Sequence, residues 1–197
     1  MKIAITGHTK RIGKAILDSF KQGNVETIGF SKSNGYDITK PSIRKKIVKA
    51  TKDFDVFINN AHKGFAQVEM LNAIFDSWQH EENKLIINIG VDTVPYTAWQ
   101  VVHRQYPVEK VALHSQIELL HNTERNCKIT NLALGWVDTE FNKNIKEPKL
   151  SYENITNTIK WIIDMDFEVK QIVMSAYKNS VWQDDSGLGI ADFGYDA

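Results

Sequence analysis

Tyr106 and Lys110 are the two residues of this 197-residue sequence whose types and spacing best suit proton transfer. At i and i+4 they would lie on one face of a helix, one turn from each other. A free tyrosine titrates near a pKa of about 10, and a neighbouring ammonium lowers that value because it stabilises the phenolate. Pro107 is tolerated only near the start of a helix. The pattern therefore predicts an acid–base pair in the first turns of a helix, although surface pairs share this spacing.

A glycine-containing segment near the N-terminus, TGHTKRIG at 6–13, follows an apolar stretch and opens an amphipathic one. Unpaired N–H groups and the positive end of the helix dipole make such a helix start an anion site. Gly7 can make the tight turn, and Gly13 lets the helix pack closely on the strand. Arg11 stands where a middle glycine lets a diphosphate approach, so its side chain must point away or contact the phosphates. The predicted dinucleotide contacts are Gly7, Thr9, Lys10, Arg11, Ile12 and Gly13.

The end of the second apolar segment indicates which dinucleotide would bind. An acidic residue there holds the ribose 2′-hydroxyl of NAD, but this chain reads Phe30-Ser31-Lys32-Ser33. A carboxylate would repel a 2′-phosphate, whereas Ser31 and Lys32 could bind it, with added positive charge from Lys10. The sequence therefore favours NADP(H) over NAD, unless the two lysines are merely solvated.

Apolar segments of strand length alternate with amphipathic segments of helix length along the chain. The predicted strands are 2–6, 25–30, 55–59, 84–89, 129–133 and 171–175. The predicted helices are 11–21, 41–51, 66–80, 104–124 and 152–164. This alternation is typical of βαβ units, and continuously apolar strands indicate a sheet buried on both faces. We expect an α/β fold, a single doubly wound Rossmann-type parallel sheet of about seven strands with helices on both faces.

The last segment of the chain, 180–197, differs in composition from the rest. It carries four Asp, no Lys or Arg, and the aromatic residues Trp182, Phe193 and Tyr195. We expect one domain over 1–179, followed by an acidic, aromatic tail without regular structure.

The charge balance and composition limit the kinds of molecule that we expect this protein to bind. Basic and acidic residues both number 24, which gives no reason to expect nucleic acid or a membrane surface. Cys127 is the single cysteine, and His114 and His121 lack a third ligand at metal-like spacing. We expect a cytoplasmic protein with a small-molecule substrate and no metal site, and leave open a homo-oligomer, either dimer or tetramer.

Several segments together resemble the short-chain dehydrogenase/reductase family. The matching pieces, in family order, are TGHTKRIG at 6–13, Asp37-Ile38-Thr39, Asn59-Asn60-Ala61, IINIG at 86–90, YPVEK at 106–110 and LGWVDT at 134–139. The resemblance implies hydride transfer between NAD(P) and a carbonyl, an alcohol or a related double bond. Tyr106 would be the general acid or base, and Lys110 would bind the ribose and tune Tyr106. Further cofactor contacts would come from Asp37 to the adenine, from Ile38, Asn60 and Ala61, and from Val137 and Thr139 to the nicotinamide carboxamide.

The sequence also departs from the family pattern. The catalytic serine position holds Val91, which cannot donate a hydrogen bond, and Asp92 and Thr93 are the nearest replacements. His62 stands in place of the glycine after Asn-Asn-Ala. The family's relay asparagine could correspond to Asn72. The segment 140–150 is the expected substrate lid, and Tyr96, Trp99 and Trp136 could stack on a planar substrate.

These departures leave two alternatives to a general carbonyl reductase. Pteridine reductases of this family carry Arg at the middle-glycine position, a different residue after Asn-Asn-Ala and Asp in place of serine. Arg11 and His62 match the first two features, and Asp92 matches the third with a register that is off by one residue. In that reading Asp92 joins Tyr106 in proton delivery to a dihydropterin. The other alternative is a catalytically weak NADP(H)-binding sensor, suggested by Val91 at the serine position.

Overall fold

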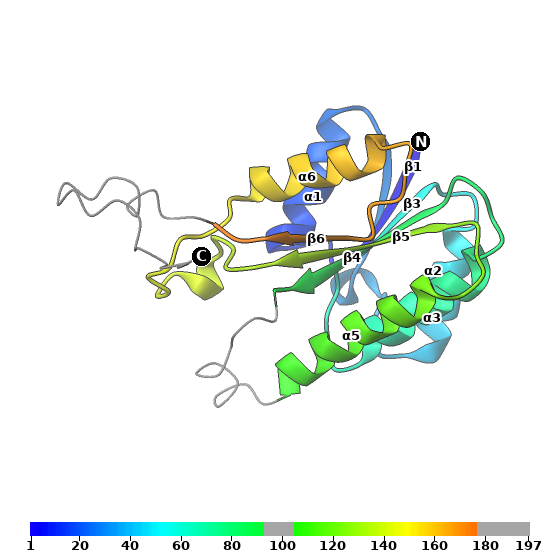
Figure 1. Ribbon diagram of the computed structural model, residues 1–197, viewed down its shortest axis with the longest axis horizontal. Helices are drawn as coiled ribbons and strands as arrows, with labels where there is room; N and C mark the ends of the chain where they lie inside the picture. The colour runs from blue at the N-terminus through cyan, green and yellow to red at the C-terminus, as the bar shows by residue number, and fades with distance from the viewer. Residues whose placement is uncertain (93–104, 177–197) are drawn as a thin grey trace, which may run out of the picture.

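The computed structural model describes residues 1–92 and 105–176, and its centre is a parallel sheet with strand order β2-β1-β3-β4-β5-β6 (Figure 1). The strands are β1 Lys2–Thr6, β2 Glu26–Phe30, β3 Val56–Asn59, β4 Leu85–Val91, β5 Lys128–Leu134 and β6 Gln171–Met174. All six correspond to predicted strands. The doubly wound parallel sheet is confirmed, with six strands in the described residues against the about seven expected.

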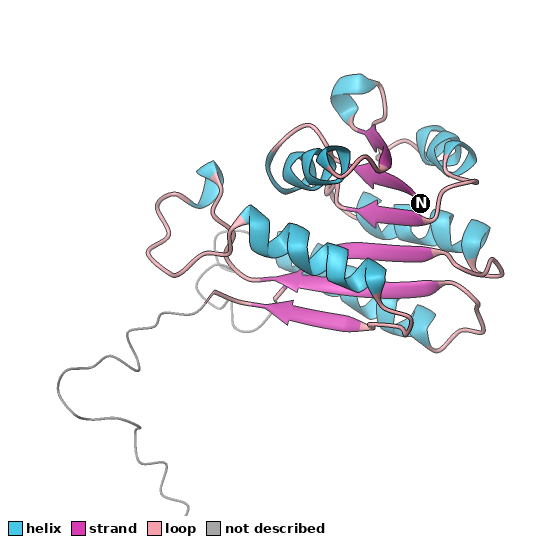
Figure 2. Cartoon of the chain, turned by 90° about the horizontal axis from the view of Figure 1, so that it is seen from above, coloured by secondary structure: helices cyan, strands magenta, loops and turns pink. Residues whose placement is uncertain are grey.

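Helices cover both faces of the sheet (Figures 1 and 2). The helices are α1 Arg11–Gln22, α2 Pro41–Ala50, α3 Ala66–Trp78, α5 Gln105–His121 and α6 Tyr152–Asp164, with short 3-10 helices η1 Lys32–Asn34 and η2 Glu140–Asn142. One layer is formed by α1 and α6, and the other by α2, α3 and α5. The five α-helices lie where the sequence predicts them, with ends that differ by a few residues.

Two apolar clusters, one on each face, bury the sheet. Neighbouring strand residues point to opposite faces, so Phe57 joins the cluster under α2, α3 and α5, while Ile58 joins the cluster under α1 and α6. Ile86 and Ile87 divide in the same way on β4. This double burial explains why the central strands are continuously apolar in sequence.

The chain reverses its winding direction at β1. From β1 it passes to β2 on one side, then returns across β1 to β3 on the other side. Because all strands are parallel, their carboxyl ends lie at one edge, and a crevice for ligands forms there at the switch point. The switch point falls between the loop that follows β1 and the loop that follows β3.

Candidate active site

The loop after β1 is shaped by its glycines as the sequence predicts. Gly7 has a φ of +73°, and its N–H donates to the Phe30 carbonyl oxygen at 2.7 Å. A Cβ on Gly13 would overlap the Gly7 carbonyl oxygen and approach the Asn60 amide nitrogen. Both glycines are therefore required for the close packing of α1 against the loop.

The loop after β3 is tied directly to this glycine loop. The buried Thr6 hydroxyl oxygen accepts hydrogen bonds from the N–H groups of Asn60 and Ala61, both at 3.0 Å. The Asn60 side chain donates in return to the carbonyl oxygens of Thr6 and Gly7, at 3.0 and 3.3 Å. Asn60 and Ala61, predicted as cofactor contacts from the family resemblance, thus lie beside the glycine loop at the switch point.

Arg11 is the first residue of α1 and takes a left-handed backbone conformation, with a φ of +50°. That conformation costs a residue other than glycine about 1–2 kcal/mol, which is consistent with a position where glycine is usual. Thr9, Lys10 and Arg11 are exposed at the rim, and Ile12 packs on the core. Burial raises the pKa of Tyr152 on α6, and the Arg11 guanidinium opposes that rise, so the two side chains lie near each other.

The turn after β2 gathers the residues predicted to read the adenosine end. Ser31 is buried and its hydroxyl pairs with that of Ser33 at 2.8 Å. Lys32 is largely exposed, with its Nζ 3.8 Å from an Asp37 carboxylate oxygen. The other Asp37 oxygen accepts from the Thr39 hydroxyl at 2.7 Å and the Thr39 N–H at 3.1 Å, and these bonds lower the pKa of Asp37. Ile38 beside them is buried.

Tyr106 and Lys110 lie in the first two turns of α5, as predicted. The Lys110 Nζ is 5.7 Å from the centroid of the Tyr106 ring. Lys110 is 5% exposed, and its ammonium donates to Gln67 Oε1 at 2.8 Å and to the Ile89 carbonyl oxygen at 3.0 Å. Burial lowers the pKa of Lys110 to about 7, and Glu109 opposes part of this shift. The pair therefore brings a buried lysine beside a phenol at the end of β4.

Gln67, which sequence reasoning missed, connects Lys110 to the sheet. Its Nε2 donates to the carbonyl oxygens of Asn59 and Ile89 at 2.8 and 3.1 Å. Asn59 donates back to the Gln67 carbonyl oxygen at 2.9 Å and to Asn88 Oδ1 at 3.0 Å. Gln67 is thus the residue of α3 that binds the Lys110 ammonium. The correspondence of Asn72 to the family's relay asparagine stays a prediction.

His62 and Glu109 are also brought to this site. His62 Nε2 lies 2.8 Å from Glu109 Oε2, and the His62 ring meets the Tyr106 ring edge-on, with centroids 4.8 Å apart and planes at 77°. Burial, with the Lys110 ammonium, lowers the pKa of His62. The lowered pKa favours the neutral imidazole, whose Nε2 lies in close contact with the Glu109 carboxylate. The sequence marked His62 as a departure from the family, but no local signal indicated Glu109.

Asp92, one of the two proposed replacements for the missing serine, lies just after β4. The Asp92 N–H donates to the Leu134 carbonyl oxygen at 2.9 Å, and Ser175 donates to Asp92 Oδ2 at 3.1 Å. Asp92 thus stands at the carboxyl end of the sheet, beside the end of β5. Several predicted residues lie outside the described part of the chain: Thr93, Tyr96, Trp99 and the tail 180–197.

The segment after β5 returns to form a short ladder. The Leu150 N–H donates to the Trp136 carbonyl oxygen at 2.7 Å, and the Asp138 N–H donates to the Leu150 carbonyl oxygen at 2.9 Å. Val137 and Thr139, predicted to contact the nicotinamide, are both buried. The proposed lid 140–150 therefore leaves the sheet and comes back beside Val137.

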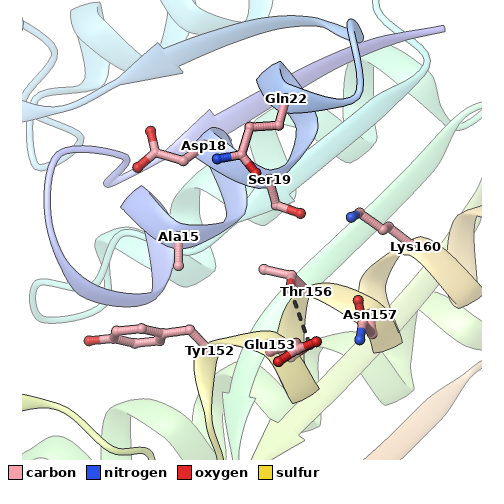
Figure 3. A pocket seen from close by; sticks show the side chains of 9 residues that line it. All are labelled: Ala15, Asp18, Ser19, Gln22, Tyr152, Glu153, Thr156, Asn157 and Lys160. Atoms are coloured by element: carbon pink, nitrogen blue, oxygen red, sulfur yellow. Dashed lines mark hydrogen bonds between the residues drawn. The ribbon is translucent and has the colours of Figure 1, made fainter.

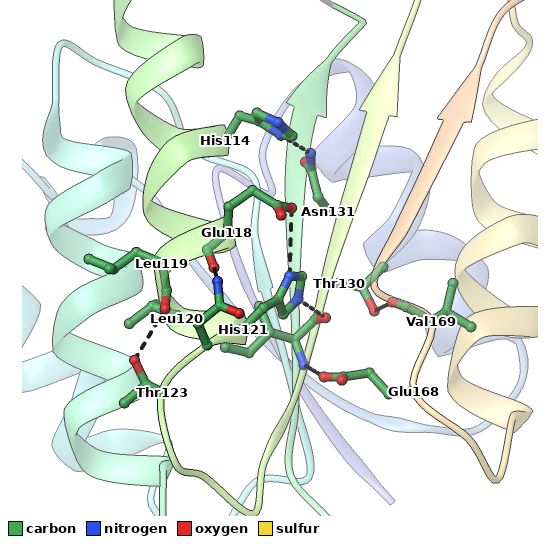
Figure 4. Close-up of polar contacts among 12 residues, drawn as sticks. His114, Glu118, Leu119, Leu120, His121, Thr123, Thr130, Asn131, Glu168 and Val169 are labelled. Atoms are coloured by element: carbon green, nitrogen blue, oxygen red, sulfur yellow. Dashed lines mark hydrogen bonds and ion pairs between the residues drawn. The ribbon is translucent and has the colours of Figure 1, made fainter.

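His114 and His121 on α5 have structural partners, and the cysteine is buried. His114 Nδ1 lies 3.1 Å from Asn131 Nδ2, and His121 Nε2 lies 3.0 Å from the Ile129 carbonyl oxygen (Figure 4). Cys127 is buried, and burial raises the pKa of its thiol to about 11. Within residues 1–92 and 105–176, no three His, Cys, Asp or Glu side chains gather as a metal site would require. No helix in those residues is both long and apolar enough to cross a membrane.

An open groove of about 330 Å³ lies between α1 and α6, on the face of the sheet opposite α5 (Figure 3). Its walls are polar, with Asp18, Gln22 and Lys160 among the side chains that line it. None of the predicted site residues lines it. The groove is therefore separate from the candidate site at the carboxyl ends of the strands.

Comparison with known proteins places the fold. No protein-family profile and no curated protein matches the sequence, but solved short-chain dehydrogenases match the structure. With 14–18% identity in the first five such matches, the likeness shows the fold, and this chain has the fold of the short-chain dehydrogenases.

Three of these structures illustrate the likeness. A short-chain dehydrogenase from Burkholderia cenocepacia J2315, in complex with NADP, matches with a TM-score of 0.71 at 16% identity, over 89% of this chain and 88% of that one. The 3-alpha-hydroxysteroid dehydrogenase from Pseudomonas sp. B-0831, complexed with NADH, gives 0.69 at 16%, over 88% and 95%. An alcohol dehydrogenase from the archaeon Thermococcus sibiricus, complexed with 5-hydroxy-NADP, gives 0.67 at 18%, over 89% and 97%.

Proposed function

We propose that this chain is an NADP(H)-dependent oxidoreductase that transfers hydride to or from a small carbonyl, alcohol or C=N substrate. The observation that carries the proposal is the buried Lys110 ammonium, 5.7 Å from the Tyr106 ring. Both residues lie on α5, which packs against β4 and β5, and Lys110 reaches the Ile89 carbonyl oxygen near the carboxyl end of β4, at the edge of the sheet that also carries the glycine loop. Solved structures of the same fold that contain NADP or NADH support a nicotinamide dinucleotide as the cofactor.

The residues present fit such a cofactor along the carboxyl edge of the sheet. Gly7 and Gly13 let the loop pack closely on α1, and the N–H groups at the N-terminus of α1 would hold the diphosphate. Ser31 and Lys32 would hold the 2′-phosphate of NADP, with Asp37 and Ile38 at the adenine. Asn60 and Ala61 would line the middle of the site, and Val137 and Thr139 would meet the nicotinamide end. The cofactor supplies the hydride when bound.

Tyr106 is the proposed proton carrier. In the reductive direction its hydroxyl donates a proton to the substrate oxygen or nitrogen as hydride reaches the adjacent carbon. Lys110 stabilises the resulting phenolate through its positive charge, and Gln67 and Ile89 hold the ammonium in place. Asp92 or Thr93 would supply the second polar contact to the substrate, which Val91 cannot make.

A dihydropterin is the second substrate class that we propose to test. Arg11 is exposed in the glycine loop, where its guanidinium could cover a flat ring as well as a phosphate. Asp92 stands at the end of β4 and accepts a hydrogen bond from Ser175. Arg11 and Asp92 together favour a planar heterocyclic substrate, which the guanidinium could cover and the Asp92 carboxylate could contact.

The experiment is NADPH oxidation in the presence of a panel of small carbonyls, imines and dihydropterins. We expect turnover with at least one class, and a loss of at least about a hundredfold in kcat for Tyr106→Phe and for Lys110→Met. Lys84→Met is the matched control, because Lys84, like Lys110, donates two hydrogen bonds from its ammonium, here to the Lys52 and Phe54 carbonyl oxygens, but lies at the opposite end of β4. Equal activity of Tyr106→Phe and the wild type would reject the assignment.

A nucleotide-binding sensor is the competing function, and Val91 at the serine position is the feature that favours it. Calorimetry with NADPH separates the two. Binding of NADPH together with no oxidation across the whole panel would support the sensor and exclude the enzyme.

A further inference from the structure

His62 and Glu109 form a pair that the proposed chemistry does not use, although it adjoins both proton-transfer residues. The Nε2 of His62 and Oε2 of Glu109 are 2.8 Å apart, and the two side chains are 24% and 12% exposed. This close polar contact is shielded from water, and polar contacts are stronger where the surroundings are less polar. The pair therefore holds the His62 ring in one orientation.

The same helix carries both groups that His62 contacts. Tyr106 and Glu109 are three positions apart on α5 and so lie on neighbouring turns of one face. His62 meets the edge of the Tyr106 ring at one end and the Glu109 carboxylate at the other. Since His62 follows β3, this two-point contact joins the start of α5 to the loop that also carries Asn60 and Ala61.

The charges around His62 favour its neutral form. Glu109, Lys110 and Lys63 are the charged groups near it, Tyr106 is the other titratable neighbour, and Gln67 adds a polar contact. Burial and the Lys110 ammonium disfavour an imidazolium. His62 thus lies, in its neutral form, between the Glu109 carboxylate and the edge of the Tyr106 ring.

We propose that His62, held by Glu109, is a positioning residue that fixes the Tyr106 phenol for proton transfer. Proton transfer needs the hydroxyl at hydrogen-bond distance from the reacting atom, and Val91 removes the serine hydroxyl that would otherwise share this site. The contact with the His62 ring restricts the orientation of the Tyr106 phenol and needs no serine hydroxyl to do so. The inference rests on the proposed function and adds to it a residue at a position where the resembling family has glycine.

The test compares His62→Gly, Glu109→Ala and Glu109→Gln in the full chain. We expect His62→Gly and Glu109→Ala to lower kcat by about tenfold or more, with the KM for NADPH changed by less than about twofold. Glu109→Gln should keep most of the wild-type kcat, because a side chain of the same length and shape can keep the polar contact with His62 Nε2. The pH-independent maxima of kcat are compared, since Glu109 also raises the pKa of Lys110.

His121 and Glu118 provide the matched control pair on the same helix. Their side chains approach to 3.7 Å near the other end of α5 (Figure 4). Glu118→Ala should leave kcat unchanged, which separates a specific effect on Tyr106 from a general loosening of the helix. A wild-type kcat in His62→Gly, or an equal loss in Glu109→Gln and Glu109→Ala, would overturn the proposal.

A readout that needs no turnover keeps this inference distinct from the proposed function. NMR of protein labelled at the tyrosine ring carbons, assigned with Tyr106→Phe, reports the Tyr106 ring directly. We expect a shifted or broadened Tyr106 signal in His62→Gly and Glu109→Ala but not in Glu118→Ala. If the wild type turns over no substrate while these signals change, the proposed reaction fails and the His62–Tyr106 contact stands. Unchanged signals in His62→Gly reject the contact.

Discussion

Lys110 donates a hydrogen bond from its buried ammonium to Gln67 Oε1 at 2.8 Å, and a second to the Ile89 carbonyl oxygen at 3.0 Å. A lysine ammonium has three donors, so these two acceptors fix the direction of the third. Lys110 therefore reaches the end of β4 already oriented, and its orientation depends on a glutamine in α3.

The burial of Lys110 predicts a pH dependence of stability. Its pKa is lowered from 10.5 to about 7 in the folded protein, so between these values the unfolded chain binds more protons. The free energy of unfolding should therefore rise with pH across this window, by up to about 1.4 kcal/mol per pH unit. Below about pH 7 the destabilisation is fully present, and above about pH 10.5 it is absent.

Urea unfolding of the wild type and Lys110→Met at pH values across this window measures the effect. The wild-type curve should gain stability relative to the variant as pH rises, because methionine has no proton to lose. Parallel curves for the two proteins would show that burial does not shift Lys110.

Gln67→Leu should destabilise the protein and weaken its activity together. The substitution removes one hydrogen bond each from Lys110, the Asn59 carbonyl and the Ile89 carbonyl, although Lys110 and the Ile89 carbonyl keep the bond to each other. Lost hydrogen bonds at buried groups cost about 1–3 kcal/mol each. We expect a loss of about 2–4 kcal/mol in the free energy of unfolding. Chemical denaturation checks this, with Gln22→Leu on the exposed face of α1 as the control. Similar stabilities of the two variants would contradict the central role of Gln67.

The strands and the glycine loop could be predicted because their signals are local. Continuous apolar segments such as VFI in β3 mark double burial, and Gly7 and Gly13 act within a few residues of each other. Lys110 and Gln67, by contrast, are 43 positions apart. No pattern within α3 distinguishes Gln67 from a surface glutamine, so the fold alone reveals their contact.

His62 and Glu109 also differ in how far the sequence alone identifies them. His62 follows Asn60 and Ala61 in a motif with a known family pattern, so it stands out as a departure from that pattern. Glu109 lies between Tyr106 and Lys110, where any polar residue fits a helix surface. Its role depends on how the loop after β3 packs on α5, and this packing is a tertiary contact that sequence periodicity does not encode.

Lys32→Glu should change the preference between the two nicotinamide cofactors. The Lys32 side chain is 86% exposed and stands in the turn after β2, where the 2′-phosphate of NADP would lie. Reversing its charge should weaken NADPH binding by about tenfold and change NADH binding by less than about twofold. Calorimetric titration of both nucleotides at low salt measures the two affinities. Lys46→Glu on α2 serves as the control, and an equal loss for NADPH and NADH would exclude Lys32 as the 2′-phosphate contact.

Gly13→Ala should abolish close packing at the glycine loop. The added Cβ would overlap the Gly7 carbonyl oxygen, which is backbone and cannot move away without deforming the loop. We expect a loss of about 1–3 kcal/mol in stability, together with a loss of NADPH binding. Thermal unfolding and calorimetry test both effects. Gly23→Ala is the comparison, because the nearest atom to its added Cβ is at an ordinary distance of 3.4 Å.

Arg11→Gly and Arg11→Ala together test the left-handed backbone at the start of α1. Glycine accepts a φ of +50° without a steric penalty, whereas alanine keeps that penalty. Arg11→Gly should therefore be about 1 kcal/mol more stable than Arg11→Ala. Both variants lack the guanidinium, so both should bind NADPH about tenfold more weakly than the wild type. Equal stability of the two variants would show that residue 11 is not left-handed, while unchanged NADPH affinity would show that Arg11 points away from the phosphates.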